Sequence, residues 1–500
     1  MLDVNGCRLV ALQVGRRFRL VEVSGIGLGG DSFLISTTTI RAELEDYIKS
    51  EGTTLHRFAE SAGVNVGTLS GIINGNRPIA IGQLDRITTA MGLPEGHFYD
   101  LYADECFIST APHWRRLRPF LLRCAELQRH DCIKQVLNRL LEDLKQVAGI
   151  FETAEIMYEQ GWKEAAVILY ESVIESERSN HSERLAMSYY RIFQIYQADG
   201  RKGYRAAIQF LPYRYRLPEY YALDGLLMLA EVYAVRMNWI EVENYADELC
   251  EFSKRLYERK VWKHADFRPV RPLVMYYGKS YLFKAMTYEY RGMFEESKKW
   301  IAEYADLSWF NGLDEAGVEE VERLKMFAEA NYMCADIKAG NRSRIPGYIQ
   351  FLVEHPDEII EGLITLIESA NRHNFYIDDV IGKFSTEIEQ YRQTGKDNWF
   401  SQRAAKEPSY IFRCAFFFQN YAIYNLRKDL HREGLMNILH SMQLSINLNS
   451  KDLIVNSMVI FELNRQFASE TQCKDYYELC RKVWENEKEN VLGGFGYAYA

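Results

Sequence analysis

The feature that most constrains this fold is a unit of two helical segments and a short turn that recurs beyond about residue 130. In the first copy, IFETAEIMYEQGWKEAAVILYESVIES, a segment of apolar and small residues leads to Gly161, and a second segment carries Ala165 and Tyr170. Later copies turn at Gly200, near Asn238, at Gly292 and at Gly340. The interval is about 40 residues at first and about 50 later, a spacing typical of helical repeats.

Two or three further helix pairs fit in 357–393, 409–446 and 451–487. One pair cannot bury its apolar face alone, so neighbouring pairs must stack and share a core. The units resemble degenerate tetratricopeptide (TPR) repeats, and that resemblance implies a right-handed coil with a concave groove. Only 11 prolines and 32 glycines in 500 residues also favour helix over sheet. We therefore expect an all-α chain in which residues 136–490 form a TPR-like α-solenoid.

The groove has candidate ligand residues on the first helix of each unit. Side chains one position after the small packing residue of a first helix are expected to face the groove, which selects Gln194, Glu231 and Glu289. Amides can donate and accept hydrogen bonds at once, so asparagines on later first helices could hold the backbone of an extended peptide. These are Asn331, Asn420, Asn425 and Asn456. For each of them the alternative is an ordinary surface or helix-end asparagine.

A different pattern, of short helices, runs from Thr37 to about residue 104. Thr54 and Asn65 are suitable N-caps, and Gly63 between them supplies a positive-φ turn. The expected helices include residues 66–73 and a segment that begins near Ile81. Four or five short helices fit in this stretch of about 65 residues.

This order of helices and turns resembles the repressor-type helix-turn-helix domain of the XRE, or lambda-repressor, family over residues 38–102. The residues that carry the resemblance are Ala59, Gly63, Val64, Leu69, Ser70, Ile72, Gly75 and Pro78, followed by Leu84, Ile87, Ala90 and Leu93. The resemblance implies a DNA-binding domain at 37–104 whose helix 66–73 lies in the major groove.

The same resemblance assigns individual residues to DNA. Asn65, Val66, Gly67, Thr68 and Gly71 would face base edges, with Asn74, Asn76 and Arg77 near phosphates. Val66 and Gly71 depart from the family, in which many members carry glutamine and a longer polar or basic side chain at these positions. We therefore expect few direct base contacts, made by Asn65, by Thr68 and by an apolar contact from Val66 to a thymine methyl.

Charge bears on this assignment. Residues 40–102 carry five Lys or Arg and eight Asp or Glu, and the whole chain has a net charge of -9. A domain of the same fold that docks a protein is therefore the alternative. The basic helical linker 105–135 offers the missing charge, because Arg115, Arg116 and Arg118 could contact phosphates beside the recognition helix. Its plainer interpretation is a solvated helix face.

The first 36 residues differ from the rest. CRLVALQVGRRFRLVEV followed by SGIGLGGDS predicts one or two strands and a glycine-rich loop, which we interpret as an extension or hairpin without a function of its own. GIGLGG lacks the following Lys-Ser/Thr of a phosphate-binding loop.

A helix-turn-helix followed by TPR-like repeats resembles the RRNPP group of peptide-sensing regulators in Gram-positive bacteria and, in plan, the phage arbitrium receptor. The resemblance implies a homodimer that binds duplex DNA and changes its DNA affinity when a short signalling peptide fills the groove. The alternative is a peptide-regulated adaptor that sequesters a protein or acts on a phosphatase-type partner.

Other functions find little support in the residues. The ten histidines form no HExxH, no serine lies in GxSxG, and the nine cysteines form no CxxC pair, so we expect no enzyme, no cofactor and no metal site. No apolar run reaches the length of a membrane span, and no signal peptide is recognisable. Scattered cysteines are typical of reduced thiols, so we expect a cytoplasmic protein with no membrane partner.

Overall fold

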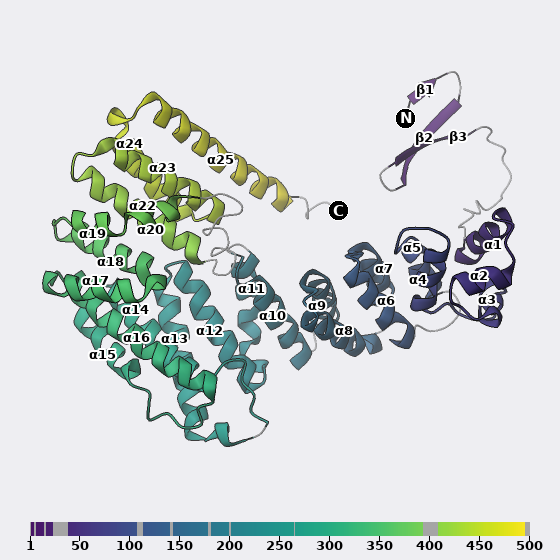
Figure 1. Ribbon diagram of the computed structural model, residues 1–500, viewed down its shortest axis with the longest axis horizontal. Coiled ribbons are helices and arrows are strands. Elements are labelled where there is room, and N and C mark those ends of the chain that lie inside the picture. Colours follow the sequence, from purple (N-terminus) through teal and green to yellow (C-terminus); the bar gives the residue numbers. More distant parts are fainter. Residues whose placement is uncertain are drawn as a thin grey trace. The chain divides into compact units, whose positions relative to one another are not determined.

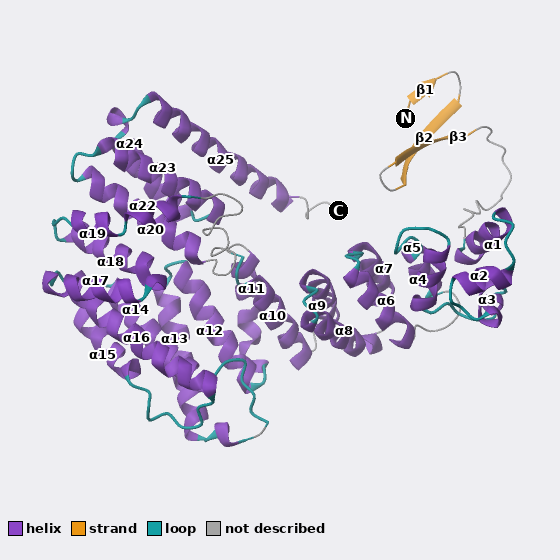
Figure 2. Cartoon of the chain, viewed as in Figure 1, coloured by secondary structure: helices purple, strands orange, loops and turns teal. Residues whose placement is uncertain are grey.

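The computed structural model describes residues 2–4, 7–14, 17–23, 39–107, 114–140, 144–178, 182–199, 202–264, 266–393 and 409–495. Contacts between residues divide the chain into two units, Met1–Phe120 and Leu121–Ala500. The described part of the chain is helical apart from three short strands near the N-terminus (Figure 2). The expectation of a mainly helical chain is confirmed.

The three strands form one antiparallel sheet. Strands β1 (Leu2–Val4), β2 (Cys7–Val14) and β3 (Arg17–Val23) lie in the order β1-β2-β3, with Val10 opposite Val21. The sequence predicted one or two strands here, so the sheet exceeds that expectation and departs from a purely α chain. The predicted glycine-rich loop lies outside the described residues.

Five short helices follow in the first unit. They are α1 (Ile40–Ser50), α2 (Leu55–Ser61), α3 (Val66–Ile73), α4 (Ile81–Ala90) and α5 (Tyr99–Glu105). The side chains of Thr54 and Asn65 cap α2 and α3 as predicted, and Gly63 between them has a φ of +58°. Phe58 of α2 and Leu69 of α3 are buried, and the Phe58 ring packs against Tyr47 of α1 at 5.7 Å.

The predicted linker contains two helices, α6 (Trp114–Glu126) and α7 (His130–Leu140). The beginning of α6 belongs to the first unit, because the Phe120 ring packs edge-on against Tyr99 at 5.3 Å and Tyr102 at 4.9 Å. The N-terminal half of α6 is therefore part of the small domain rather than a free connection.

The second unit continues as a row of helices (Figure 1). They are α8 (Val147–Glu159), α9 (Lys163–Glu177), α10 (Glu183–Tyr196), α11 (Lys202–Phe210), α12 (Glu219–Val235), α13 (Trp239–Glu258), α14 (Leu273–Tyr290), α15 (Phe294–Ala305), α16 (Glu315–Lys338), α17 (Ile345–Glu354), α18 (Ile359–Arg372), α19 (Asp378–Lys383), α20 (Ser385–Arg392), α22 (Ser409–Leu426), α23 (His431–Leu448), α24 (Lys451–Leu463) and α25 (Glu470–Phe495). Most helices pack against the next one along the chain, whereas α18 packs mainly against α22, and α25 packs against α23.

The predicted turns between paired helices are confirmed where the structure describes them. Gly161, Gly292 and Gly340 have positive φ, and Asn238 caps α13 directly after Met237, whose φ is 54°. The predicted turn at Gly200 lies outside the described residues. Helices α12, α14, α16, α18 and α22 also contact one another in that order. The unit is thus a stack of helix pairs with a continuous row of first helices.

Two glycines allow the closest approaches within this stack. A Cβ at Gly278 of α14 would come within 2.3 Å of Leu324 of α16, and a Cβ at Gly362 of α18 would come within 2.4 Å of Leu352 of α17. Both neighbours are buried leucines, so a larger residue at either glycine would require these leucine side chains or the helices to shift.

Candidate DNA interface and ligand groove

The N-terminus of α3 presents the side chains that the sequence assigns to base edges. The Asn65 side-chain oxygen accepts hydrogen bonds from the backbone N–H of Gly67 (2.9 Å) and of Thr68 (3.3 Å), which anchors the helix start. Asn65 and Gly67 are exposed, and Val66 and Thr68 are half-buried. The amide nitrogen of Asn65 is therefore the group on this cap that is placed to donate to a ligand.

The loop after α3 returns onto the helix through Arg77. Its backbone N–H donates to the Gly71 carbonyl at 2.9 Å, and its guanidinium donates to the Thr68 hydroxyl at 3.1 Å. A Cβ at Gly71 would come within 3.3 Å of the Arg77 Cβ. Gly71 thus allows the close packing of Arg77, a role that the resemblance to the XRE family did not indicate. The exposed Asn74 and Asn76 lie on the same loop.

Two other arginines of this domain stabilise its fold, a role that no sequence pattern indicated. Arg86 donates to the Gly63 carbonyl at 2.9 Å, at the turn between α2 and α3. Arg41 donates to the Ile72 carbonyl at 2.8 Å, near the end of α3, and pairs with the buried Glu105 at 2.9 Å. Much of the domain's small positive charge is therefore committed to its own backbone and to Glu105.

The three linker arginines separate into two kinds. Arg115 is exposed, and Arg118 is half-buried beside the Trp114 ring, 5.9 Å from its centroid. Arg116 instead turns inward, with its guanidinium 3.3 Å from the Tyr102 hydroxyl and 3.5 Å from Glu105. The predicted phosphate contact by Arg116 does not fit this placement, because the side chain already satisfies a buried carboxylate and a buried phenol.

Gln194 belongs to a polar network that joins α8, α10 and α12. Its side-chain oxygen accepts hydrogen bonds from Arg191 and Tyr158, both at 3.0 Å, and its nitrogen donates to the Tyr190 hydroxyl at 2.8 Å. Arg191 also forms a bidentate pair with Glu155. Gln194 was predicted to meet a ligand, but its amide is committed to neighbouring helices.

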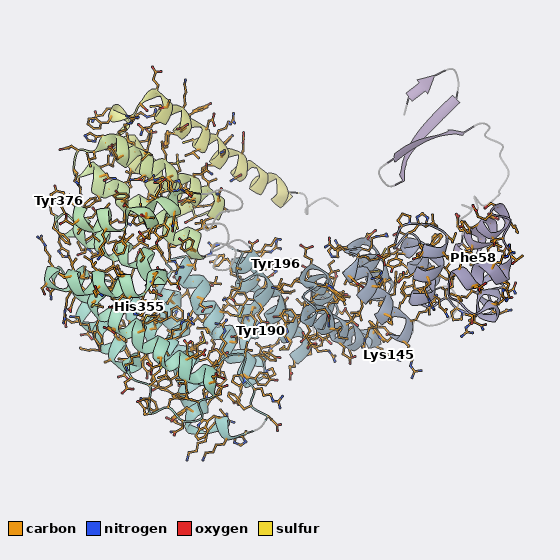
Figure 3. The ribbon with its side chains drawn as sticks, in the orientation of Figure 1. Phe58, Lys145, Tyr190, Tyr196, His355 and Tyr376 are labelled. Carbon is orange, nitrogen blue, oxygen red and sulfur yellow. The ribbon has the colours of Figure 1, made fainter. Side chains whose placement is uncertain are left out.

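Asp224 is the centre of this network. Its carboxylate is fully buried and accepts hydrogen bonds from Tyr190 at 2.8 Å and from Tyr276 at 3.1 Å, and it pairs with Arg271 at 3.1 Å. Figure 3 labels Tyr190 within this unit. Burial, and then the Asp224 charge, raises the pKa of both phenols above the ordinary range. One carboxylate thus joins α10, α12 and α14.

The predicted groove residues Glu231, Asn331 and Asn420 also contact neighbouring groups. Glu231 accepts from Gln197 at 2.7 Å and pairs with Lys279 at 3.2 Å. The Asn331 amide donates to the Tyr304 hydroxyl at 2.8 Å, and the Asn420 amide to the Phe416 carbonyl at 3.0 Å. Asn425 is buried, and Asn456 is exposed on α24. A buried amide such as that of Asn425 does not fit the predicted contact with a bound peptide.

Glu289 is the predicted groove residue that lines a cavity. This cavity, the groove pocket, has a volume of about 370 Å³ and is lined by residues of α12, α14, α16, α18 and α22 together with Trp239. Lys338 lies between two carboxylates here, 2.7 Å from Glu289 and 3.1 Å from Glu368. Burial alone would lower the pKa of Lys338, but the two carboxylates outweigh it and raise the pKa above its usual range.

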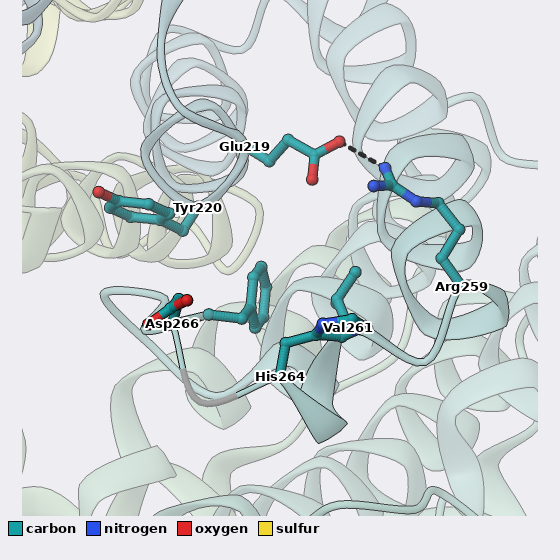
Figure 4. A pocket seen from close by; sticks show the side chains of 7 residues that line it. Glu219, Tyr220, Arg259, Val261, His264 and Asp266 are labelled. Carbon is teal, nitrogen blue, oxygen red and sulfur yellow. Dashed lines mark hydrogen bonds and ion pairs between the residues drawn. The ribbon is translucent and has the colours of Figure 1, made fainter.

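A second cavity, of about 280 Å³, lies within the same unit (Figure 4). Its walls are the start of α12 and the segment after α13. Glu219 and Arg259 form a 2.6 Å ion pair across it, with Tyr220, His264 and Asp266 around them. Because Glu219 and Arg259 balance each other's charge, this ion pair offers a charged ligand little.

Among the helices that the structure describes, none has an apolar stretch of the length that a membrane span requires. The cysteines of the described helices are free thiols. Burial, together with a hydrogen bond from Cys132, raises the pKa of the Cys124 thiol well above its ordinary value, which favours an unreactive side chain.

No family model matches this chain, and no curated protein matches it. Among solved structures, it is similar to a "Circular tandem repeat protein with novel repeat topology and enhanced subunit contact surfaces". The identity is 12%, the match covers 89% of this chain and 100% of that one, and the TM-score is 0.18. A similarity this low carries no argument about fold or function.

Proposed function

We propose that the protein is a cytoplasmic transcriptional regulator whose first unit binds duplex DNA and whose helix-pair unit binds a short signalling peptide that controls DNA affinity. The observation that supports this most is the α2–turn–α3 segment, in which a side-chain-capped helix begins with exposed small and polar residues. In the repressor-type geometry, the first turn of such a second helix meets base edges. The protein would act as a homodimer on a paired site, and its helix pairs would coil in the right-handed sense of TPR repeats.

The ligand side of the proposal rests on the groove pocket. It lies on the row of first helices, which in stacked helix pairs is the surface that faces a groove. Its volume is at the lower end of the range of small-molecule sites, so it suits one end of a peptide or one or two of its side chains.

A protein-docking adaptor is the second candidate, and one observation favours it. Residues 40–102 carry more acidic than basic residues, Arg41 and Arg86 in this stretch are engaged with backbone carbonyls, and Arg116 is engaged with Glu105, which reduces the positive charge available to phosphates. Electrostatic attraction normally supplies most of the non-specific affinity for DNA.

Immunoprecipitation of the protein from its own cells, followed by sequencing of the bound DNA, separates the two functions. We expect a small set of enriched sites with a shared, two-fold symmetric sequence, lost with the variant Asn65→Ser/Thr68→Ala. Recovery of a partner protein without any enriched DNA would support the adaptor instead.

A further inference from the structure

The chemistry of the groove pocket indicates what kind of ligand group it would take, an inference that rests on the proposed peptide-binding function. Two aromatic pairs contribute to its walls. Trp239 and Tyr290 lie 4.9 Å apart between ring centroids, and Phe412 and Phe416 are stacked at 6.2 Å with nearly parallel planes. Aromatic faces attract cations as well as apolar groups, because the ring quadrupole is negative over its face.

Around Lys338 the pocket holds more negative than positive charge. Glu289 and Glu368 share one ammonium, that of Lys338, and each carboxylate contacts it through a single oxygen. The side chains of these three residues are mostly buried, with exposed fractions of 18%, 26% and 19% for Glu289, Glu368 and Lys338. A partly desolvated site with two carboxylates and one cation is stabilised when a second cation enters it.

The other charged residues of the lining do not supply that cation. Arg413 pairs with Glu361 at 2.5 Å, so its charge is already balanced. Arg372 is exposed to water, with its guanidinium 5.8 Å from the Phe294 ring centroid. Its charge is therefore strongly screened compared with that of the buried carboxylates.

We infer that the groove pocket takes a positively charged group of the peptide, placed against Glu289 and Glu368, with an adjoining apolar side chain between the aromatic walls. The group is either the free amino end of the peptide or a lysine or arginine side chain. Both present N–H donors to the second carboxylate oxygens, and both gain from the aromatic faces.

Equilibrium dialysis of the full-length protein against pools of random hexapeptides, with bound peptides quantified by mass spectrometry, tests this. One pool has free amino ends and no Lys or Arg, a second is N-acetylated and contains Lys or Arg, and a third is N-acetylated with neither. We expect the wild type to enrich the first or the second pool about tenfold over the third, as one charge-assisted contact allows. Which pool is enriched identifies the source of the charge.

The matched variants are Glu368→Gln and Glu243→Gln. Glu368→Gln keeps the Lys338–Glu289 pair but removes the excess carboxylate, so the preference for cationic pools should fall to less than about threefold. Glu243→Gln removes a carboxylate of similar exposure that pairs with Arg291 at 2.6 Å outside the pocket lining, and it should keep the full preference.

The outcomes separate this inference from the proposed function. If the uncharged third pool binds as well as the others, or if Glu368→Gln keeps the preference, the peptide function stands and the cation site is wrong. If no pool is retained by the wild type, peptide binding and the cation site both fail.

Discussion

The two units of this protein use arginine in different ways. In the small helical domain, Arg86 and Arg41 donate to the carbonyls of Gly63 and Ile72 and so fix the backbone around α3. In the helix-pair unit, Arg191 and Arg271 reach carboxylates on neighbouring helices and so join one pair to the next. Short helices need their ends satisfied, whereas stacked helices need their mutual orientation fixed.

The two units also differ in which side chains remain available to a ligand. At the start of α3, Asn65 and Gly67 are exposed. In the helix-pair unit most of the polar side chains predicted for a ligand are already bound to neighbouring helices, and the groove pocket provides the alternative.

The largest effect is expected at the buried Asp224, whose role is to join helices. Asp224→Ala leaves Arg271 and two buried phenols without their shared acceptor, so the free energy of unfolding of the helix-pair unit should fall by about 3 to 5 kcal/mol. Urea denaturation followed by circular dichroism measures this. Asp475→Ala, at an exposed position of α25, should change stability by less than about 0.5 kcal/mol. If the two variants lost similar amounts of unfolding free energy, Asp224 would not be a residue that joins the helices.

The second prediction concerns the pH dependence of stability and His440, whose ring packs edge-on against Phe418 at 4.5 Å between centroids. Burial, and then the charge of Arg392, lowers its pKa to about 4. Between that value and the ordinary pKa of about 6.5 the unfolded chain binds a proton that the folded chain excludes, so stability is full above pH 6.5 and falls toward pH 4. His440→Gln should reduce this loss by about 2 to 3 kcal/mol. Denaturation at pH 7 and pH 4.5 tests it, and the exposed His97→Gln should leave the pH dependence unchanged.

The exposed start of α3 gives the third prediction. Asn65→Ser keeps an acceptor for the helix cap but removes the amide donor, and Thr68→Ala removes the hydroxyl. Each lost base contact should cost about 1 to 3 kcal/mol of specific DNA affinity while the fold is kept. Fluorescence anisotropy with an enriched site measures the effect, with Ser61→Ala at the end of α2 as the control. Wild-type affinity in the double variant would rule out α3 as the recognition helix.

The smallest expected effect is on the salt dependence of DNA binding, and it distinguishes Arg115 and Arg118 from Arg116. Replacing Arg115 and Arg118 by glutamine should flatten the slope of log affinity against log salt by up to about 2, for specific and random DNA alike. Arg116→Gln should leave that slope unchanged and lower stability instead, because its guanidinium pairs with Glu105. A slope change from Arg116→Gln alone would reverse this assignment.

The sequence predicted best what depends on local rules. The limits of α3, its Asn65 cap and the turns at Gly161, Gly292 and Gly340 follow from capping and from positive-φ glycine, which need only neighbouring residues. The groove residues were harder to predict. Whether Gln194 faces a ligand depends in part on Tyr158, which lies 36 residues away and donates to its side-chain oxygen. Asn425 is buried by the packing of its helix, which the local sequence does not show. Arg116 is a residue type that often contacts phosphates. Its pairing with Glu105 could not be predicted, because it depends on how α5 and α6 pack together.

The most direct test of the central claim is a titration of an enriched DNA site with the full-length protein, with and without a saturating amount of the best hexapeptide from the dialysis. The account predicts that the peptide changes DNA affinity by at least about fivefold in one direction, and that saturating DNA changes peptide affinity by the same factor, because linkage is reciprocal. DNA affinity that stays the same when the groove is saturated would contradict peptide control of DNA binding.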